Sequence, residues 1–181
     1  MKLLFFFSGF ISLLLVSCNN ENPIVDQTAN WNKEESIKMN ATFLREEESA
    51  IDQFLKRRPD WTMIKTGTGL RYFIYKSLPE EEKNQAKIDD IVTVKFSIEL
   101  LDGTICYASE KDNHETFMVE KSDIESGLHE GIKFLSVSEK AKFILPSHLA
   151  HGLIGDMDQI PPLETIIFDI ELLKITTPNE K

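Results

Sequence analysis

The sequence predicts an α+β domain in which a mostly antiparallel sheet wraps on one short helix, preceded by an amphipathic helix and a cleaved signal peptide. Three observations predict this organisation. Residues 92–100 alternate apolar and polar side chains, as a half-buried strand does. Residues 33–57 carry apolar side chains at helical spacing, and residues 1–17 form an almost unbroken apolar run. The chain therefore divides into a leader, a helix and a β-rich domain.

Length, charge and cysteine count exclude several classes of protein. The 181 residues leave room for one globular unit plus an appendage, at roughly 150 residues per domain. With 20 Lys and Arg against 30 Asp and Glu, the formal charge is -10, so no nucleic-acid partner is expected. The two cysteines, Cys18 and Cys106, are too few for a disulfide scaffold or a cysteine-rich zinc site.

Residues 1–17, MKLLFFFSGFISLLLVS, are typical of a signal peptide and shorter than the roughly 20 residues that a membrane-spanning helix needs. The following Leu15-Val16-Ser17-Cys18 resembles the lipobox of bacterial lipoproteins. That resemblance implies cleavage before Cys18 and an acylated cysteine that anchors the protein to a membrane without a spanning helix. By the same analogy, asparagine rather than aspartate after the cysteine favours the outer membrane, facing the periplasm. The alternative is a soluble exported protein with a stray cysteine at the cleavage site.

A flexible tether is predicted over residues 18–31, which are polar and lack apolar periodicity. Asn32 is suited to cap a helix, because Glu35 stands three positions later as in a capping box. The amphipathic segment spans residues 32–60, and its helix should end near Arg57, before the residue that precedes Pro59.

The apolar stripe of this helix has two interpretations. It consists of Ile37, Ala41, Leu44, Ile51 and Leu55, widened by Phe43 and Phe54. The helix either packs on its own domain or serves as a dimerisation arm. Glu48 interrupts the stripe where an apolar residue is expected, which favours packing on its own domain.

The β-rich domain spans residues 61–176 and leaves a short tail at 177–181. The only helical pattern in this half covers residues 127–136. Asp102-Gly103 marks a hairpin turn. Period-two patterns and turn residues predict strands over 70–76, 92–100, 105–108, 116–119, 140–145 and 165–175.

Four segments in this order resemble the FKBP-type peptidyl-prolyl isomerases: VTVKFSIELLDG, SGLHEGI, AKFILPSHLAHG and IPPLETIIFDIELLKI. The resemblance covers residues 62–176 and implies an FKBP-like sheet. TGTGLRY at 66–72, with the helix before it, is similar to the lead-in of exported bacterial relatives. Together with the lipobox, the pattern resembles isomerase-like lipoproteins associated with gliding motility.

The resemblance implies that the chain accelerates X-Pro isomerisation in exported, proline-containing polypeptides. An apolar bowl performs this by shape, so no acid, base or cofactor is expected. His148, His151, Asp156 and Asp158 lack the usual spacing of zinc or calcium ligands, so no metal is expected either. The alternative is a non-catalytic lipoprotein that binds peptides or a partner in a cell-envelope machine.

Four positions match the pocket that the resemblance implies. Ile124, Ile160 and Phe168 stand where the family has aliphatic or aromatic lining. Glu125 stands where the family uses a backbone N–H to anchor the bound peptide.

Five further pocket positions depart from the family. Phe96 replaces a Tyr, Leu128 replaces the Trp of the floor, and His151 replaces a Tyr whose hydroxyl holds the carbonyl of the ligand. Cys106 and Tyr107 replace Phe-Asp, which removes one aromatic wall and a carboxylate, unless a one-residue bulge presents Tyr107 as that wall. Because several contacts change together, the sequence predicts weak turnover or a shifted preference.

Overall fold

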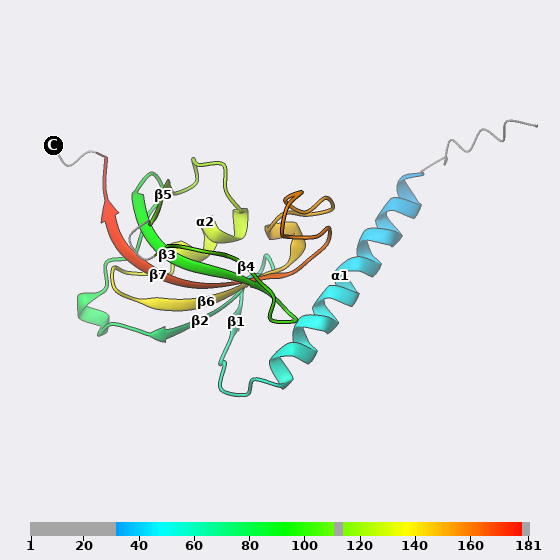
Figure 1. Ribbon diagram of the computed structural model, residues 1–181, viewed down its shortest axis with the longest axis horizontal. Helices are drawn as coiled ribbons and strands as arrows, with labels where there is room; N and C mark the ends of the chain where they lie inside the picture. The colour runs from blue at the N-terminus through cyan, green and yellow to red at the C-terminus, as the bar shows by residue number, and fades with distance from the viewer. Residues whose placement is uncertain (1–31, 111–113, 179–181) are drawn as a thin grey trace, which may run out of the picture.

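The computed structural model describes residues 32–110 and 114–178 (Figure 1). The predicted leader, Cys18 and the tether lie outside the described residues. In chain order the elements are α1 (Lys33–Lys56), β1 (Ile64–Lys65), β2 (Arg71–Lys76), the 3₁₀ turn η1 (Glu80–Glu82), β3 (Ile91–Leu100), β4 (Ile105–Ala108), β5 (Glu115–Met118), α2 (Ser126–Ile132), β6 (Lys140–Leu145), the 3₁₀ turn η2 (Ser147–Leu149) and β7 (Ile166–Thr176).

The strands form one seven-stranded antiparallel sheet in the order β1-β2-β6-β7-β3-β4, with β5 paired to β3 beside β4. The long strands β3 and β7 pair along their whole length, from Ile91 opposite Thr176 to Leu100 opposite Ile166. Alternation along β3 buries Val92 and Val94 completely. The predicted α+β class, with an antiparallel sheet and two helices, is therefore confirmed.

The two helices cover opposite faces of the sheet. Phe143 and Leu145 of β6 face α2, where Gly131 and Gly127 permit close approach. Ile144, which lies between them in the strand, points to the other face and packs with Ile51 of α1. Both faces at this end of the sheet are therefore buried, one under each helix.

Helix α1 packs on its own domain through its C-terminal half. Asn32 caps its start, because the side-chain Oδ1 accepts a hydrogen bond from the backbone N–H of Glu35 at 2.8 Å. Ile51 and Phe54 are buried, whereas Ile37 is 56% exposed. Figure 1 shows the N-terminal half of the helix extending away from the sheet. The apolar stripe is therefore covered over only part of its length.

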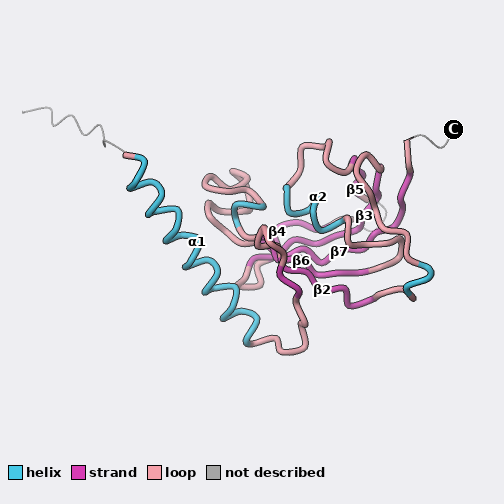
Figure 2. The backbone as a smooth tube through the Cα atoms, turned by 180° about the vertical axis from the view of Figure 1, so that it is seen from behind, coloured by secondary structure: helices cyan, strands magenta, loops and turns pink. Residues whose placement is uncertain are grey.

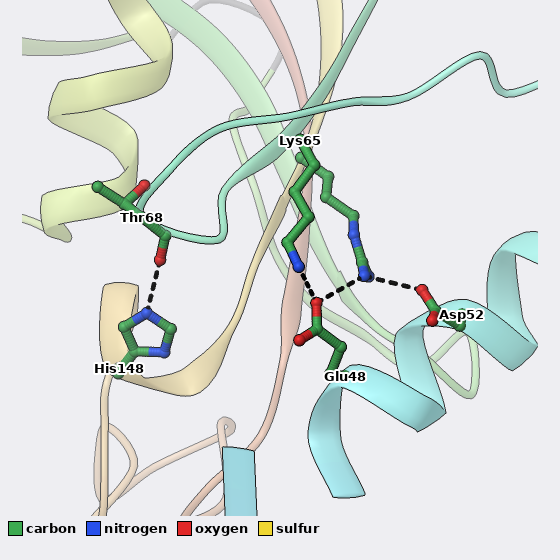
Figure 3. A network of polar contacts seen from close by, with 6 residues as sticks. Glu48, Asp52, Lys65, Thr68 and His148 are labelled. Atoms are coloured by element: carbon green, nitrogen blue, oxygen red, sulfur yellow. Dashed lines mark hydrogen bonds and ion pairs between the residues drawn. The ribbon is translucent and has the colours of Figure 1, made fainter. Parts of the chain in front are cut away.

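Glu48 interrupts the stripe because it faces two cations of the domain. Its carboxylate contacts Lys65 (Figure 3). The same carboxylate lies 3.2 Å from the guanidinium of Arg71, and Asp52 lies 2.8 Å from that guanidinium. The Arg71 side chain is 7% exposed, and a buried charge of this kind needs a partner. The hydrogen bond from Lys65 lowers the pKa of Glu48, so its carboxylate stays ionised in this contact.

Two local predictions differ from the structure. The helix predicted over 127–136 ends at Ile132, because Phe134 and Leu135 donate to carbonyls three residues back and continue as tight turns. Leu135 is still fully buried, which explains its helical spacing in the sequence. Strand β1 was not predicted, since two residues are too few to show a period.

Neither helix in the described part of the chain has the run of apolar residues that a membrane span requires.

Candidate functional site

A pocket of about 450 Å³ opens between β3, β4, β5, the start of α2 and the loop between β6 and β7. That loop, residues 146–165, lies between α1 and α2 (Figure 2). The residues that line the pocket are Phe96, Ile98, Tyr107, Ala108, Ser109, Glu110, Glu115, Glu125, His151 and Asp156.

The floor of the pocket is the ring of Phe96, which packs on the buried ring of Phe168. The ring centroids of Phe96 and Phe168 are 5.7 Å apart and their planes are inclined by 56°, within the favourable range for an aromatic pair. Phe168 is 1% exposed and sits under Phe96, on the neighbouring strand β7. Because both rings are held by paired strands, this floor is preformed.

The structure brings four of the nine predicted pocket residues to the cavity wall: Phe96, Tyr107, Glu125 and His151. The other five pack in or against the hydrophobic core below the cavity: Cys106, Ile124, Leu128, Ile160 and Phe168. Their side chains support the pocket from below instead of forming its open surface.

Tyr107 reaches the wall through a bulge in β4. Ile98 of β3 pairs with Tyr107, but the next residue, Glu99, pairs with Ile105, so Cys106 is an extra residue in the ladder. Cys106 is 6% exposed, and burial raises the pKa of its thiol, as expected for a small apolar residue. Of the two alternatives left open by the sequence, the bulge is the one observed.

The hydroxyl of Tyr107 donates a hydrogen bond to Asp156 Oδ2 at 2.5 Å, and Asp158 Oδ2 lies at 3.3 Å. This bond to Asp156 raises the pKa of Tyr107 to about 12. The contact joins β4 to the loop between β6 and β7, and so closes one side of the pocket.

Asp156 was not predicted as a pocket residue. Its Oδ1 accepts the backbone N–H groups of Asp158 at 2.9 Å and Ile160 at 2.8 Å. Partial burial raises the pKa of Asp156, but the hydrogen bonds from Tyr107 and the two N–H groups outweigh it and lower the value to about 2. The carboxylate is therefore ionised at neutral pH. The Asp-Met-Asp sequence, typical of an Asx turn, was the available signal.

Glu125 precedes α2 at its N-cap, and its side chain does not cap the helix. Its carboxylate lies instead 3.1 Å from His151 Nε2, across the mouth of the pocket. In the part of the chain described, no protein group accepts a hydrogen bond from the backbone N–H of Glu125.

The rim of the pocket is acidic, whereas the resemblance implies an apolar bowl. Four carboxylates line it, from Glu110, Glu115, Glu125 and Asp156, and His151 is the one basic side chain among the lining residues. Over the described ranges, no group of three or more His, Cys, Asp or Glu side chains is placed to hold a metal ion. The site therefore combines an aromatic floor with a negative rim.

A second cavity of about 370 Å³ lies between α1 and the loop that carries His151. Its lining residues are Asn40, Phe43, Leu44, Glu47, Ser147, His148, Gly152, Leu153 and Leu163. Leu153 is 66% exposed, so the groove continues onto an open apolar surface.

Solved structures share this fold. A peptidyl-prolyl cis-trans isomerase from Pseudomonas syringae superposes with a TM-score of 0.62 at 19% identity, covering 76% of this chain and 96% of that one. FkpA from Escherichia coli superposes with a TM-score of 0.60 at 22% identity, covering 82% and 75%.

Sequence comparison identifies the family. The chain is 36% identical over 129 residues to the probable FKBP-type isomerase FkpA of Neisseria meningitidis, 71% of this chain and 46% of that protein, so it spans less than half the length of this relative. It is 37% identical over 99 residues to FK506-binding protein 1A of Emericella nidulans, 54% of this chain and 91% of that protein. The FKBP-type peptidyl-prolyl cis-trans isomerase family model matches residues 82–173, half of the chain. The chain belongs to the FKBP-type peptidyl-prolyl cis-trans isomerase family.

Proposed function

We propose that the protein is a peptidyl-prolyl cis-trans isomerase that assists the folding of exported polypeptides and is anchored to a membrane by lipid on Cys18. The observation that carries the catalytic part is the 450 Å³ pocket over the paired rings of Phe96 and Phe168, inside the segment that matches the family. A proline ring is apolar and compact, which suits this floor.

The pocket provides what isomerisation requires. Rotation about a peptide bond faces a barrier of about 18–20 kcal/mol from amide resonance, and no covalent bond forms or breaks. An apolar floor that removes water from the carbonyl before proline favours the twisted amide, whose resonance charge separation is smaller. The free N–H of Glu125 holds the peptide backbone, and the His151 imidazole lies at the mouth, where it can donate to a carbonyl. Binding geometry thus replaces acid and base chemistry.

The acidic rim supports a preference for clients with Lys or Arg beside the proline. The Asp156 carboxylate is ionised, and three glutamates share the same lining. Paired peptides that differ only in Lys or Glu next to proline measure this preference. The Lys peptide should show the higher kcat/KM, and rising salt should reduce the difference, since screening weakens exposed charge pairs.

A proline-peptide isomerisation assay on the purified chain tests the catalytic proposal. Phe96→Ala removes the ring that forms the pocket floor over Phe168 and should lower kcat/KM at least tenfold. Phe73→Ala on β2 is the matched control, because it removes an aromatic ring outside the pocket and should leave kcat/KM near that of the wild type. Wild-type rates equal to those in buffer would refute the proposal.

The anchor is tested separately. Cells fed a labelled fatty acid should incorporate it into the wild-type chain, which should sediment with membranes of the outer-membrane fraction. Cys18→Ser should lose both properties, whereas Cys106→Ser is the control and should retain them, because this thiol is buried. Labelling that survives Cys18→Ser excludes lipid attachment at this cysteine.

A binding role without turnover is the second candidate, in which the protein holds a peptide or a partner of a cell-envelope machine, such as one of gliding type. It is favoured by the apolar groove beside α1 and by the uncovered first half of that helix. Measurable binding of unfolded, proline-rich chains without acceleration of isomerisation would support this candidate over the enzyme.

A further inference from the structure

We infer that Glu47 of α1 is a positioning residue for the isomerase pocket, because it holds both ends of the loop that carries His151 and Asp156. This inference rests on the proposed isomerase function. Glu47 is half-buried in α1, about 100 residues away in sequence from the loop that it contacts. Its hydrogen-bond partners, Ser147 and Thr165, do not line the pocket, so its effect on the reaction is indirect.

Three hydrogen bonds end on the Glu47 carboxylate. Its Oε1 accepts the backbone N–H of Ser147 at 2.6 Å and the hydroxyl of Thr165 at 2.8 Å. Its Oε2 accepts the hydroxyl of Ser147 at 3.3 Å. Such bonds to an ionised acceptor are stronger than neutral ones, and the part-buried setting reduces competition from water. These donors satisfy a carboxylate that is partly removed from solvent.

The donors stand at the two ends of one loop. Ser147 follows the end of β6 at Leu145, and Thr165 directly precedes β7, which begins at Ile166. The loop between them has little regular structure, and a loop of this length has many conformations unless its ends and interior are fixed. A single carboxylate therefore fixes where the loop leaves the sheet and where it returns.

Hydrogen bonds continue from Ser147 into the loop. The Ser147 carbonyl accepts the N–H of Gly152 at 2.8 Å, and the Gly152 carbonyl accepts the N–H of Leu163 at 2.9 Å. Gly152 directly follows His151, so the backbone that carries this pocket residue is connected to Glu47 through one intervening residue. Asp156 lies on the same loop and reaches Tyr107 across the pocket.

The other polar contacts of α1 reach a different part of the domain. Glu48 and Asp52 contact Lys65 and Arg71 on β1 and β2, as Figure 3 shows for the two acidic residues and Lys65. Substitution at Glu48 thus weakens the attachment of the helix without touching the loop. Asp52 keeps Arg71 paired when Glu48 is neutralised. Substitutions at Glu47 therefore test the positioning of the loop, whereas substitutions at Glu48 test the attachment of the helix.

The test compares Glu47→Ala and Glu47→Gln with Glu48→Gln. Steady-state isomerisation of a proline peptide gives kcat and KM, and hydrogen exchange gives the protection of the Ser147 amide and of residues 148–163. Glu47→Ala should lower kcat/KM about tenfold, with kcat falling, because a displaced loop misplaces the pocket residues. Glu47→Gln keeps an acceptor oxygen and should recover most of the loss. Glu48→Gln should match the wild type.

Thr165→Val provides a second perturbation that leaves α1 unchanged. It removes one of the three bonds and should lower kcat/KM by a smaller factor, and its effect should vanish in the Glu47→Ala background, since both changes break the same contact. If Glu47→Ala fails to fold, the kcat/KM values of Thr165→Val and Glu47→Gln decide whether Glu47 positions the loop.

Three results would overturn the inference: wild-type kcat/KM in a folded Glu47→Ala, an equal loss in Glu48→Gln, or additive effects of Glu47→Ala and Thr165→Val. If the wild-type chain itself proves inactive, the proposed function fails. The positioning role is then decided by hydrogen exchange alone, in which Glu47→Ala must lose the protection of Ser147 and of the loop while Glu48→Gln keeps it.

Discussion

Replacing Tyr107 by phenylalanine tests whether the contact between β4 and the loop shapes the pocket. The change removes one hydroxyl and keeps the ring that lines the cavity. In the wild type, Asp156 has a pKa of about 2, against an ordinary value of about 3.9. Three donors lower it, and the Tyr107 hydroxyl at 2.5 Å is the shortest contact among them. Without that hydroxyl, the pKa of Asp156 should rise part of the way to the ordinary value.

The expected rise in the pKa of Asp156 can be measured in acid. At pH 3 a carboxyl with a pKa of about 2 is roughly nine-tenths ionised, whereas one whose pKa has risen to about 3 is half ionised. Carbon-detected NMR titration of the Asp156 side chain in wild type and Tyr107→Phe measures this difference. Tyr107→Phe should also lower kcat/KM less than tenfold, whereas Tyr107→Ala, which removes the wall, should lower it more.

The sign of the stability effect follows from the pKa values. The pKa of Asp156 is lowered on folding, so its contribution to stability is present above about pH 4 and is lost as the pH falls toward 2. The pKa of Tyr107 is raised to about 12, so its contribution is present below about pH 10 and is lost as the pH rises toward 12. The stability difference between wild type and Tyr107→Phe should therefore narrow at both extremes. An Asp156 titration that is identical in the two proteins would refute this account of the pocket wall.

Three further substitutions, one of them paired with a control, test the packing of the domain, each by urea unfolding. Gly131→Ala places a methyl carbon 2.7 Å from Phe143 Cε2 and should cost about 1–3 kcal/mol from overpacking, whereas Gly67→Ala, with no atom within 4 Å, should be neutral or slightly stabilising. Glu139→Ala should cost about 3 kcal/mol, because this fully buried carboxylate accepts hydrogen bonds from two backbone N–H groups that would lose their partner. A near-neutral result would show that these two bonds do not stabilise the domain. Phe54→Ala should cost about 3–5 kcal/mol if α1 unfolds together with the sheet. A separate transition of α1 at low urea would show that the helix unfolds independently.

Local patterns predicted the parts of the fold that depend on neighbouring residues. The alternation from Val92 to Leu100 located β3, because one face of that strand is buried and the other is less so. Asn32 and Pro59 bounded α1, since a cap and a proline act within one helical turn. Each of these signals lies within a few residues of the element that it determines.

The features that the sequence did not predict depend on contacts between distant segments. Glu47 was one of three consecutive glutamates with no local sign that it contacts residues 100 and 118 positions away. Asp156 lies in an irregular loop, where no periodicity relates a side chain to a face. The bulge at Cys106 was foreseen only as an alternative, because a one-residue shift leaves the composition of the strand unchanged.

The pocket contains an aromatic wall and a carboxylate, the two groups whose absence the sequence predicts, but the two come from different elements. Where the resemblance to the family implies an aromatic residue followed by an aspartate on one strand, this chain has Cys106 and Tyr107. In the structure Tyr107 forms the aromatic wall, and a carboxylate at the same wall comes from Asp156 on the facing loop. A carboxylate carried by a strand is held by the sheet, whereas one carried by a loop depends on whatever holds that loop. In this protein Glu47 of α1 holds the loop, and Glu47 lies outside the segment that matches the family. Removal of α1 should therefore impair the pocket even where the sheet remains folded.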